Sequence, residues 1–238
     1  MHVPYGLHPI EDCETCVRHA ENCFCELPAP ARKVLQEIKY TSYYPAGSLL
    51  FVEGQEPRGV YLLCEGRVKL QMASPEGKML ILRIAGPGEV LGMHAAIPGK
   101  PFEHTAETLQ PSQVSFLKTE DFVRLLHQFP QASAKVLGLL SDHYRAACYQ
   151  VRCLGLSRSA GEKIARFLLA SSEQGQETRK GTRFHLLLTH EEIAQLLGVS
   201  RETVTRTLTE FRKGLLISIR GSAVTIRNKT GLRGLLAA

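Results

Sequence analysis

Short apolar runs separated by glycines fill the chain from Tyr43 to Lys118. The runs SLLFVEG, GVYLLCEG, RVKLQMA and MLILRIAG are rich in β-prone residues. Turn residues at regular intervals between strands this short predict an all-β roll or barrel. The SPEGK segment at 74–78 predicts a hairpin turn that joins two of these strands.

Helical patterns flank the predicted roll. ARKVLQEIK at 31–39 predicts a short helix before it, and TEDFVRLLHQ predicts a helix after it with Thr119 as the N-cap. A longer helix is expected from Pro130 to about Leu154. Its apolar residues recur three and four positions apart, as in a coiled-coil seam: Leu137, Leu140, Tyr144, Ala147, Val151 and Leu154. The seam predicts the interface of a homodimer, and packing of the helix on the roll is the alternative.

Capping signals open the helices of the last third of the chain. Ser159 with Glu162, and Thr189 with Glu192, have the spacing of capping boxes. Between the two boxes, SSEQGQETRKGTR predicts a surface loop and FHLLL predicts a short strand. The second box opens HEEIAQLLG, and its final glycine, Gly198, predicts the end of that helix.

A helix–turn–helix pattern follows from this second box. Ser200 caps another helix over 201–213, and one side of the helix pair is apolar. The apolar residues are Ile193, Leu196, Leu197, Val199, Val204, Leu208 and Phe211. LLISIRGSAVTIRN then predicts two short strands joined around Gly221, which form a wing. This order of elements predicts a winged helix–turn–helix that binds DNA.

The exposed side of the helix over 201–213 carries side chains that can read base edges. Arg201 lies four positions before Thr205, and Glu202 lies four positions before Arg206. Arginine can donate two hydrogen bonds to guanine, and glutamate can accept one from cytosine. A surface ion pair between Glu202 and Arg206 is the alternative. The candidate DNA-binding residues are Thr189, Ser200, Arg201, Glu202, Thr203, Thr205 and Arg206.

The distribution of charge agrees with a DNA-binding end. Of the 29 Lys and Arg residues, 14 lie after residue 156, together with only 7 of the 23 Asp and Glu residues. The other 15 basic and 16 acidic residues nearly cancel over the first 156 positions. Such an asymmetry is expected of a nucleic-acid-binding domain joined to a near-neutral domain, and an inert basic surface is the alternative.

Length and composition narrow the class of protein. With 238 residues, 44% of them hydrophobic, the chain suffices for two domains with buried cores. No run of 18 apolar residues and no N-terminal signal pattern occur, so we expect a cytoplasmic protein. The number of cysteines is odd, seven, which argues against a framework of disulfides in the reducing cytoplasm. Three of them, Cys64, Cys148 and Cys153, are expected to be structural. The sequence has no nucleophile elbow, P-loop or HExxH motif, so we do not expect an enzyme. A metal-binding structural dimer is a further alternative to the DNA-binding protein.

The succession of a roll, a long dimer-type helix and a winged helix–turn–helix resembles the Crp/Fnr family of bacterial transcription regulators. YPAGSLLFVEGQEPRGVYLLCEGRVKL and LTHEEIAQLLGVSRETVTRTL carry the resemblance, which covers residues 31 to 230 or so. It implies an α+β fold of four parts: a cysteine-rich arm (1–30), a cyclic-nucleotide-binding-like β-roll or jelly roll (31–128), a dimerisation helix (129–156) and a DNA-binding domain (157–238). It also implies an activator that binds double-stranded DNA and RNA polymerase as a homodimer.

SRETVTR resembles the catabolite-activator branch of that family, in which this helix reads the TGTGA half-sites of an inverted repeat. The matching residues here are Arg201, Glu202 and Arg206. Thr205 adds a hydroxyl where the Fnr branch, which reads TTGA half-sites, has a serine. The resemblance therefore implies a half-site of one of these types, or a hybrid of them.

The family's cassette for cyclic nucleotides is altered in GEVLGMHAAIPGKPFEHTAETL. Gly92 matches the cassette, but Met93 replaces the glutamate that holds the ribose. His104 lies near the position of the arginine that neutralises the cyclic phosphate, and a neutral imidazole is a poor substitute for it. The resemblance therefore argues against cAMP. A different ligand of the roll, with Lys100 or His104 at an anion, is an alternative.

Four of the cysteines lie in CETCVRHAENCFC at 13–25. Cys13, Cys16 and Cys25 resemble the N-terminal cysteines that hold an oxygen-labile [4Fe–4S] cluster in the Fnr branch. That branch takes its fourth ligand from the roll, near 112–115, where this chain has no cysteine. We therefore expect Cys23 as the fourth thiolate. Zn²⁺ binding, thiol redox switching and no ligand at all are the alternatives.

Overall fold

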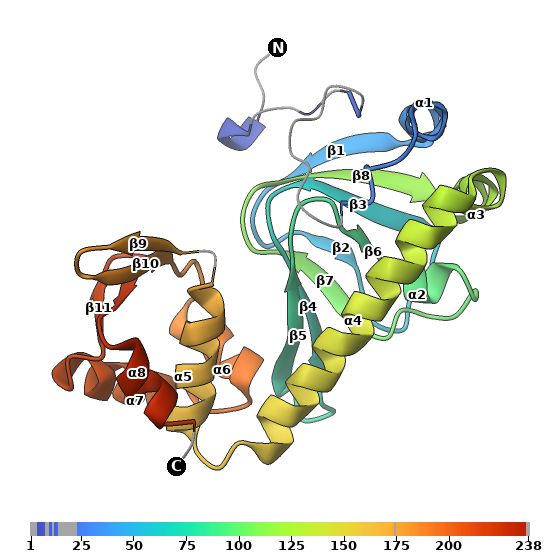
Figure 1. Cartoon of the computed structure of the whole chain (residues 1–238). Coiled ribbons are helices and arrows are strands. Elements are labelled where there is room, and N and C mark those ends of the chain that lie inside the picture. The colour runs from blue at the N-terminus through green and yellow to red at the C-terminus, as the bar shows by residue number, and fades with distance from the viewer. Residues whose placement is uncertain (1–3, 8–9, 11, 14–22, 174, 237–238) are drawn as a thin grey trace. The chain divides into compact units, whose positions relative to one another are not determined.

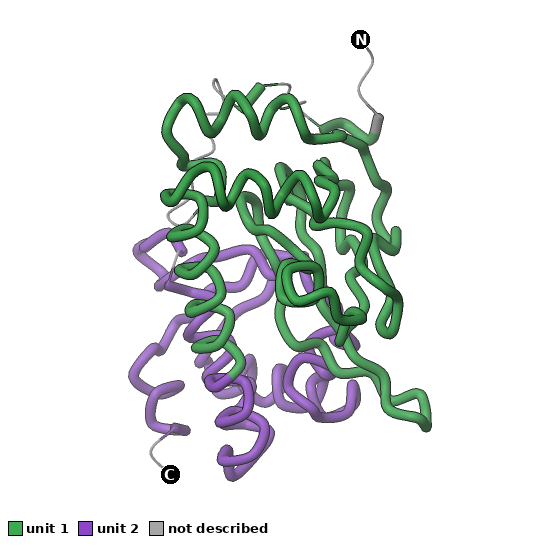
Figure 2. Tube along the Cα trace, turned by 90° about the vertical axis from the view of Figure 1, so that its right-hand side faces the viewer, with its two compact units in different colours: residues 1–147 green, residues 148–238 purple. Residues whose placement is uncertain are grey.

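The computed structural model describes residues 4–7, 10, 12–13, 23–173 and 175–236 (Figure 1). The chain forms two compact units, residues 1–147 and residues 148–238 (Figure 2). Over the described ranges, no helix combines the length and the apolar character that a membrane crossing needs.

Unit 1 contains a β-roll of two four-stranded antiparallel sheets (Figure 1). The first sheet has the order β1 (Tyr40–Tyr44), β8 (Ser112–Lys118), β3 (Gly59–Glu65) and β6 (Val90–Leu91). The second has the order β2 (Leu49–Phe51), β7 (Thr105–Thr108), β4 (Val68–Ala73) and β5 (Met79–Ala85). The turn predicted at 74–78 is confirmed: it joins β4 to β5, and Gly77 has a φ of 80°.

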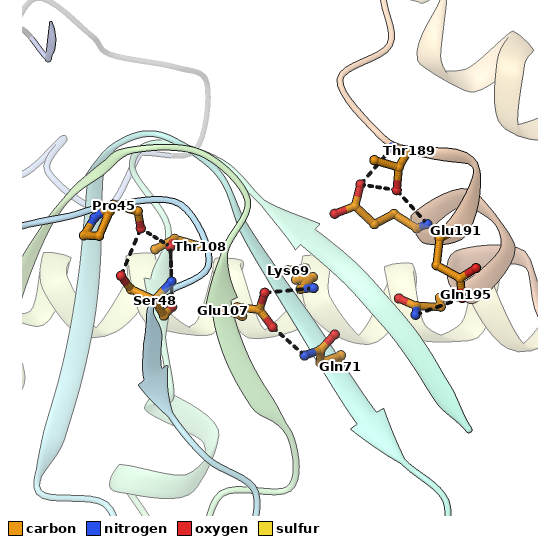
Figure 3. Close-up of polar contacts among 10 residues, drawn as sticks. Pro45, Ser48, Lys69, Gln71, Glu107, Thr108, Thr189, Glu191 and Gln195 are labelled. Atoms are coloured by element: carbon orange, nitrogen blue, oxygen red, sulfur yellow. Dashed lines mark hydrogen bonds and ion pairs between the residues drawn. The ribbon is translucent and has the colours of Figure 1, made fainter. Parts of the chain in front are cut away.

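Side chains of the first sheet alternate between two cores. Leu63 and Val114 pack between the sheets, against Phe51 and other residues of the second sheet. Leu62 and Leu117 point to the opposite face, where helices cover the sheet. The described helical segments of unit 1 are η1 (Pro4–Gly6), α1 (Ala29–Ile38), α2 (Met93–Ala96) and α3 (Thr119–Gln128). Helix α4 (Pro130–Leu156) begins in unit 1, and its residues from Cys148 on belong to unit 2. Polar contacts also join strands of the second sheet, where Glu107 accepts from Lys69 and Gln71 at 3.1 and 2.9 Å (Figure 3).

The predicted N-cap at Thr119 is wrong. α3 begins at Thr119 itself, the preceding residue is Lys118, and no side chain caps the helix. The Thr119 amide instead donates to the carbonyl of Arg58 at 3.2 Å. Strand β8 therefore runs directly into the helix, and the backbone amide finds its partner across the sheet.

The described part of unit 2 contains the end of α4, four further helices and one four-stranded sheet. The helices are α5 (Ala160–Ser171), α6 (His190–Leu197), α7 (Arg201–Lys213) and α8 (Lys229–Gly234). The sheet has the order β11 (Ile217–Arg220), β12 (Ala223–Ile226), β10 (Gly181–His185) and β9 (Gln176–Thr178). The helix–turn–helix and the two wing strands are confirmed. The loop predicted before β10 is wrong in part, because Gln176–Thr178 pairs with β10 as a hairpin.

Candidate DNA-binding surface and candidate sensor sites

Local capping fixes the geometry of the helix–turn–helix. Thr189 and Glu192 make both bonds of a capping box at the start of α6 (Figure 3). Gly198 ends α6 with a φ of 62°, in the left-handed region that favours glycine. Ser200 accepts from the Thr203 amide at 3.2 Å and caps α7. Thr189, Ser200 and Thr203 are thus held in hydrogen bonds that start the two helices.

Helix α7 has one buried side and one exposed side. Val204, Leu208 and Phe211 are buried in the core of unit 2, together with Thr207. The exposed side forms a shallow groove lined by Arg201, Glu202, Thr205, Arg206, Thr209, Glu210 and Lys213. The structure therefore brings four of the predicted base-reading residues together on one face.

The hydroxyl of Thr205 is already engaged with the protein. It donates to the Arg201 carbonyl at 3.0 Å, and it lies 2.8 Å from Nδ1 of His190. Of the four predicted base-reading residues in the groove, Thr205 is therefore the one whose hydroxyl is engaged between the two helices. His190 was not expected from the sequence, because only the meeting of α6 and α7 brings it to Thr205.

Glu202 is held as a carboxylate at the start of α7. A backbone amide and the Ser200 hydroxyl lower the pKa of Glu202. Among the described residues, no ion pair joins Glu202 to Arg206. An ionised and exposed carboxylate at this position can accept a hydrogen bond from a base amino group.

A second basic surface lies on the wing sheet. Its lining includes Arg179, Lys180, Arg183, Arg220 and Arg227, with no acidic residue among the lining side chains. The sequence pattern did not predict this surface, because Arg179 and Lys180 lie in the segment that was expected to be a surface loop. The hairpin of β9 and β10 is what places them beside the wing strands.

Three of the arm cysteines are buried against the roll. Cys13, Cys23 and Cys25 lie in the core cluster that α1, α3 and α4 share with the first sheet, whereas Cys16 lies outside the described residues. The Cys13 amide donates to Gln36 at 3.1 Å, and the Lys39 ammonium donates to the Cys13 sulfur at 3.2 Å.

Hydrogen bonding between the thiols shifts the pKa values of Cys13 and Cys25 in opposite directions. The hydrogen bond from Cys25 and the ammonium of Lys39 outweigh burial and lower the pKa of Cys13 to about 6. Contacts with Cys13 and Cys23 raise the pKa of Cys25. The lowered pKa of Cys13 favours its thiolate, which is the form that binds soft metals. Within the described ranges, no three His, Cys, Asp or Glu side chains are arranged as a metal site.

In the segment that corresponds to the family's cyclic-nucleotide cassette, the side chains at positions 93 and 104 are apolar or neutral. Met93 is fully buried, and His104 stacks on His94 with ring centroids 4.7 Å apart. Burial, and then the nearby His94, lower the pKa of His104 to about 4, so this imidazole is neutral. The neighbouring Arg83 pairs with Glu89 and contacts His143 of α4.

Helix α4 carries two apolar stripes. Ala132, Val136 and Leu139 are buried against the roll, with Leu140 partly buried beside them. The other stripe is solvent-exposed: Leu137, Tyr144 and Val151 are 68, 72 and 69% exposed. Of the remaining seam residues, Ala147 is exposed and Leu154 is half-buried. The predicted seam is thus exposed at four of its six positions.

Two family models match the chain, a cyclic nucleotide-binding domain over residues 41–129 and a Crp-like helix-turn-helix domain over residues 162–235. The transcriptional activatory protein AadR of Rhodopseudomonas palustris is 29% identical over 99% of this chain and 100% of its own length. The CRP-like cAMP-activated global transcriptional regulator of Mycobacterium tuberculosis is 26% identical over 86% of this chain and 89% of its own. The structure of FixK2 from Bradyrhizobium japonicum, 23% identical, has a TM-score of 0.73 over 84% of this chain and 98% of that one. This last similarity shows a shared fold.

The two matched models follow the order of the structure itself. The first coincides with the sheets of unit 1, and the second begins in α5 and ends after the wing. The chain therefore belongs to the Crp/Fnr family of DNA-binding transcription regulators, a family without enzymatic activity.

Proposed function

We propose that this regulator binds, as a homodimer, an inverted repeat of TGTGA- or TTGA-type half-sites. The observation that carries the proposal is the exposed face of α7, where Arg201, Glu202 and Arg206 line one groove while Val204 anchors the opposite side in the core. Two such helices, one from each chain, enter successive major grooves about 34 Å apart.

The exposed stripe of α4 supports the homodimer. Leu137, Tyr144 and Val151 follow one another at intervals of seven residues and are each more than two thirds exposed. Large apolar side chains in a heptad row are stabilised by packing against an identical row. A second copy of this chain is the partner whose surface matches that repeat.

We also propose that the arm cysteines make DNA binding respond to redox state or oxygen. The support is the buried contact of Cys13 and Cys25, together with the ammonium of Lys39 beside the Cys13 sulfur. The proposed ligands are Cys13, Cys25, Cys23 as the fourth thiolate, and Cys16, which lies outside the described residues. When bound, a [4Fe–4S] cluster would supply an oxygen-labile group held by thiolates. Zn²⁺ is the alternative metal, since it binds the same thiolates.

A ligand in the roll is the competing signal. The relative from Mycobacterium tuberculosis is named as cAMP-activated, which makes a cyclic nucleotide the first ligand to test. Three features argue against it: Met93 is buried, His104 is neutral, and Arg83 is already paired with Glu89. A cyclic phosphate would therefore meet no unengaged cation among these side chains. If the roll does bind a signalling ligand, that ligand would be a small molecule other than a cyclic nucleotide.

The test of the proposal is DNA binding by protein purified without oxygen. Fluorescence anisotropy would compare a duplex carrying the inverted TGTGA repeat with a scrambled duplex of the same composition. The proposal expects at least a thousandfold preference for the repeat, the lower end of specific recognition. Addition of air should change the affinity, whereas addition of cAMP should not. Transcription in vitro with RNA polymerase, the expected second partner in the cytoplasm, then separates activation from repression.

A further inference from the structure

His190 of α6 lies beside the groove of α7, outside the set of predicted base-reading residues. It is the first residue of α6, it is exposed, and its Nδ1 atom lies 2.8 Å from the Thr205 hydroxyl. Thr205 is one of the residues that line the groove. The contact therefore places an imidazole next to the base-reading face of α7.

Hydrogen bonding assigns one proton of this imidazole. A hydroxyl has a single proton to donate, and that of Thr205 goes to the Arg201 carbonyl at 3.0 Å. The same oxygen can then only accept from His190, so Nδ1 carries a hydrogen and Nε2 of a neutral ring has a lone pair. Within the part of the chain that the structure describes, Nε2 has no hydrogen-bond partner.

The place of His190 in the helix–turn–helix brings its ring to the DNA backbone. When the second helix of such a motif lies in the major groove, the first helix crosses the sugar–phosphate backbone. His190 is in the first turn of α6, which is the first helix of the pair. Phosphate oxygens only accept hydrogen bonds, so the lone pair of a neutral Nε2 opposes the contact. A proton on Nε2 turns the contact into a charge-assisted hydrogen bond.

The acidic neighbours of His190 are engaged within α6. Glu192 accepts from the amide and the hydroxyl of Thr189, at 2.8 and 2.9 Å. Glu191 accepts from Gln195 at 3.3 Å (Figure 3). The charged side chains that α7 contributes to the neighbouring groove are Arg201, Glu202, Arg206, Glu210 and Lys213. Carboxylates favour a cationic ring and the basic groups oppose it, whereas a phosphate is the charge that DNA binding adds.

We propose that His190 binds a DNA phosphate through Nε2, and that each chain takes up one proton from solvent at this atom as the regulator binds DNA. The inference rests on the DNA-binding part of the proposed function and adds a contact that does not depend on base sequence. Thr205 is a positioning residue, because its hydroxyl fixes the ring with Nδ1 toward α7. Since the complex holds more protons than the free protein, DNA affinity rises as pH falls through the range in which histidine changes charge.

Matched histidine variants test the proposal. Fluorescence anisotropy would measure the affinity of the full chain, purified without oxygen, for the inverted repeat and for the scrambled duplex at pH 8 and pH 6. Between these pH values the wild type is expected to gain about tenfold more affinity than His190→Gln, within the limit of about tenfold per pH unit for each proton bound. The gain should be equal on the two duplexes, because phosphate contacts carry no sequence information.

The control is His185→Gln. His185 is also exposed in unit 2, and its Nδ1 lies 3.3 Å from the Ser222 hydroxyl. This variant should keep the wild-type dependence on pH.

Salt dependence gives a second readout. At pH 6 the wild-type slope of log affinity against log salt should be steeper than at pH 8 by up to about 0.9 for each chain, because a protonated His190 displaces a further counterion. His190→Arg, with a permanent charge, should show the steep slope at both pH values. His190→Gln should show the shallow slope at both.

Equal pH dependence of wild type and His190→Gln would overturn the proposal, as would its loss in His185→Gln alone. A proton effect confined to the inverted repeat would overturn the phosphate contact and indicate a base contact instead. A wild type with the pH effect on both duplexes but no preference for the repeat would support the contact of His190 and contradict the sequence-specific part of the proposed function.

Discussion

Substitution of Arg206 by alanine separates base reading from general attraction to DNA. Arg206 is exposed in the groove of α7, and no ion pair is formed by its side chain among the described residues. The free protein therefore loses no internal salt bridge, and the effect on binding reports contacts with DNA. Loss of a bidentate contact with guanine costs about 1–3 kcal/mol. A homodimer loses one such contact on each half-site, so its binding to the inverted repeat should weaken by about 30-fold or more.

The control is Lys213→Ala, because Lys213 lines the same groove at the other end of α7. A lysine that contacts only phosphate should weaken binding to the inverted repeat and to the scrambled duplex equally. It should also change the slope of log affinity against log salt by about 0.9 for each chain of the dimer. Fluorescence anisotropy on both duplexes over a series of salt concentrations measures all of these quantities. If Arg206→Ala loses the same factor on both duplexes, the reasoning that Arg206 reads a base is refuted.

Three further substitutions address the other parts of the molecule. Tyr144→Glu places a charge in the exposed stripe of α4 and should yield monomers in analytical ultracentrifugation, whereas Arg145→Glu, on an adjacent exposed position, should leave a dimer. The lowered pKa of His104, about 4, means that the unfolded chain takes up the proton first as pH falls. Urea unfolding should therefore show a loss of about 2 kcal/mol between pH 7.5 and pH 5, and His104→Gln should lose most of that difference; equal pH dependence would count against the buried imidazole. Thr189→Ala should destabilise unit 2 by about 0.5–2 kcal/mol through the lost cap, with Thr189→Ser close to wild type. A change in base preference without a change in stability would instead make Thr189 a DNA contact.

The parts of the fold that depend on neighbouring residues were predictable from the sequence. The caps at Thr189 and Ser200 and the turn at Gly198 involve residues within four positions of each other, so their spacing alone identified α6 and α7. β9 was missed because all three of its residues are exposed, and a strand without a buried face has no alternating pattern. The cap at Thr119 failed for another reason, since its amide is bound by Arg58 of a distant segment.

The candidate sites were predictable only as lists of residues. Periodicity identified a seam on α4, but it could not say that Ala132, Val136 and Leu139 form a second stripe that packs on the roll. The arm and the roll meet through residues far apart in the sequence, as where the Ile10 amide donates to the side chain of Gln113, 103 positions away. No local pattern encodes such a meeting. The hydrogen bond between His190 and Thr205 engages the hydroxyl of one predicted base-reading residue. It likewise could not be predicted without the packed structure.

The central claim is that a dimer of this chain reads an inverted repeat through α7. Selection of bound duplexes from a random library by the anaerobic protein, followed by sequencing, tests this claim without prior choice of an operator. The account predicts an enriched inverted repeat whose half-site centres lie about one helical turn, or 10 base pairs, apart. It also predicts that Arg206→Ala relaxes selection at one position in each half-site while the spacing is kept. Enrichment of a single unrepeated site, or of no sequence at all, would contradict it.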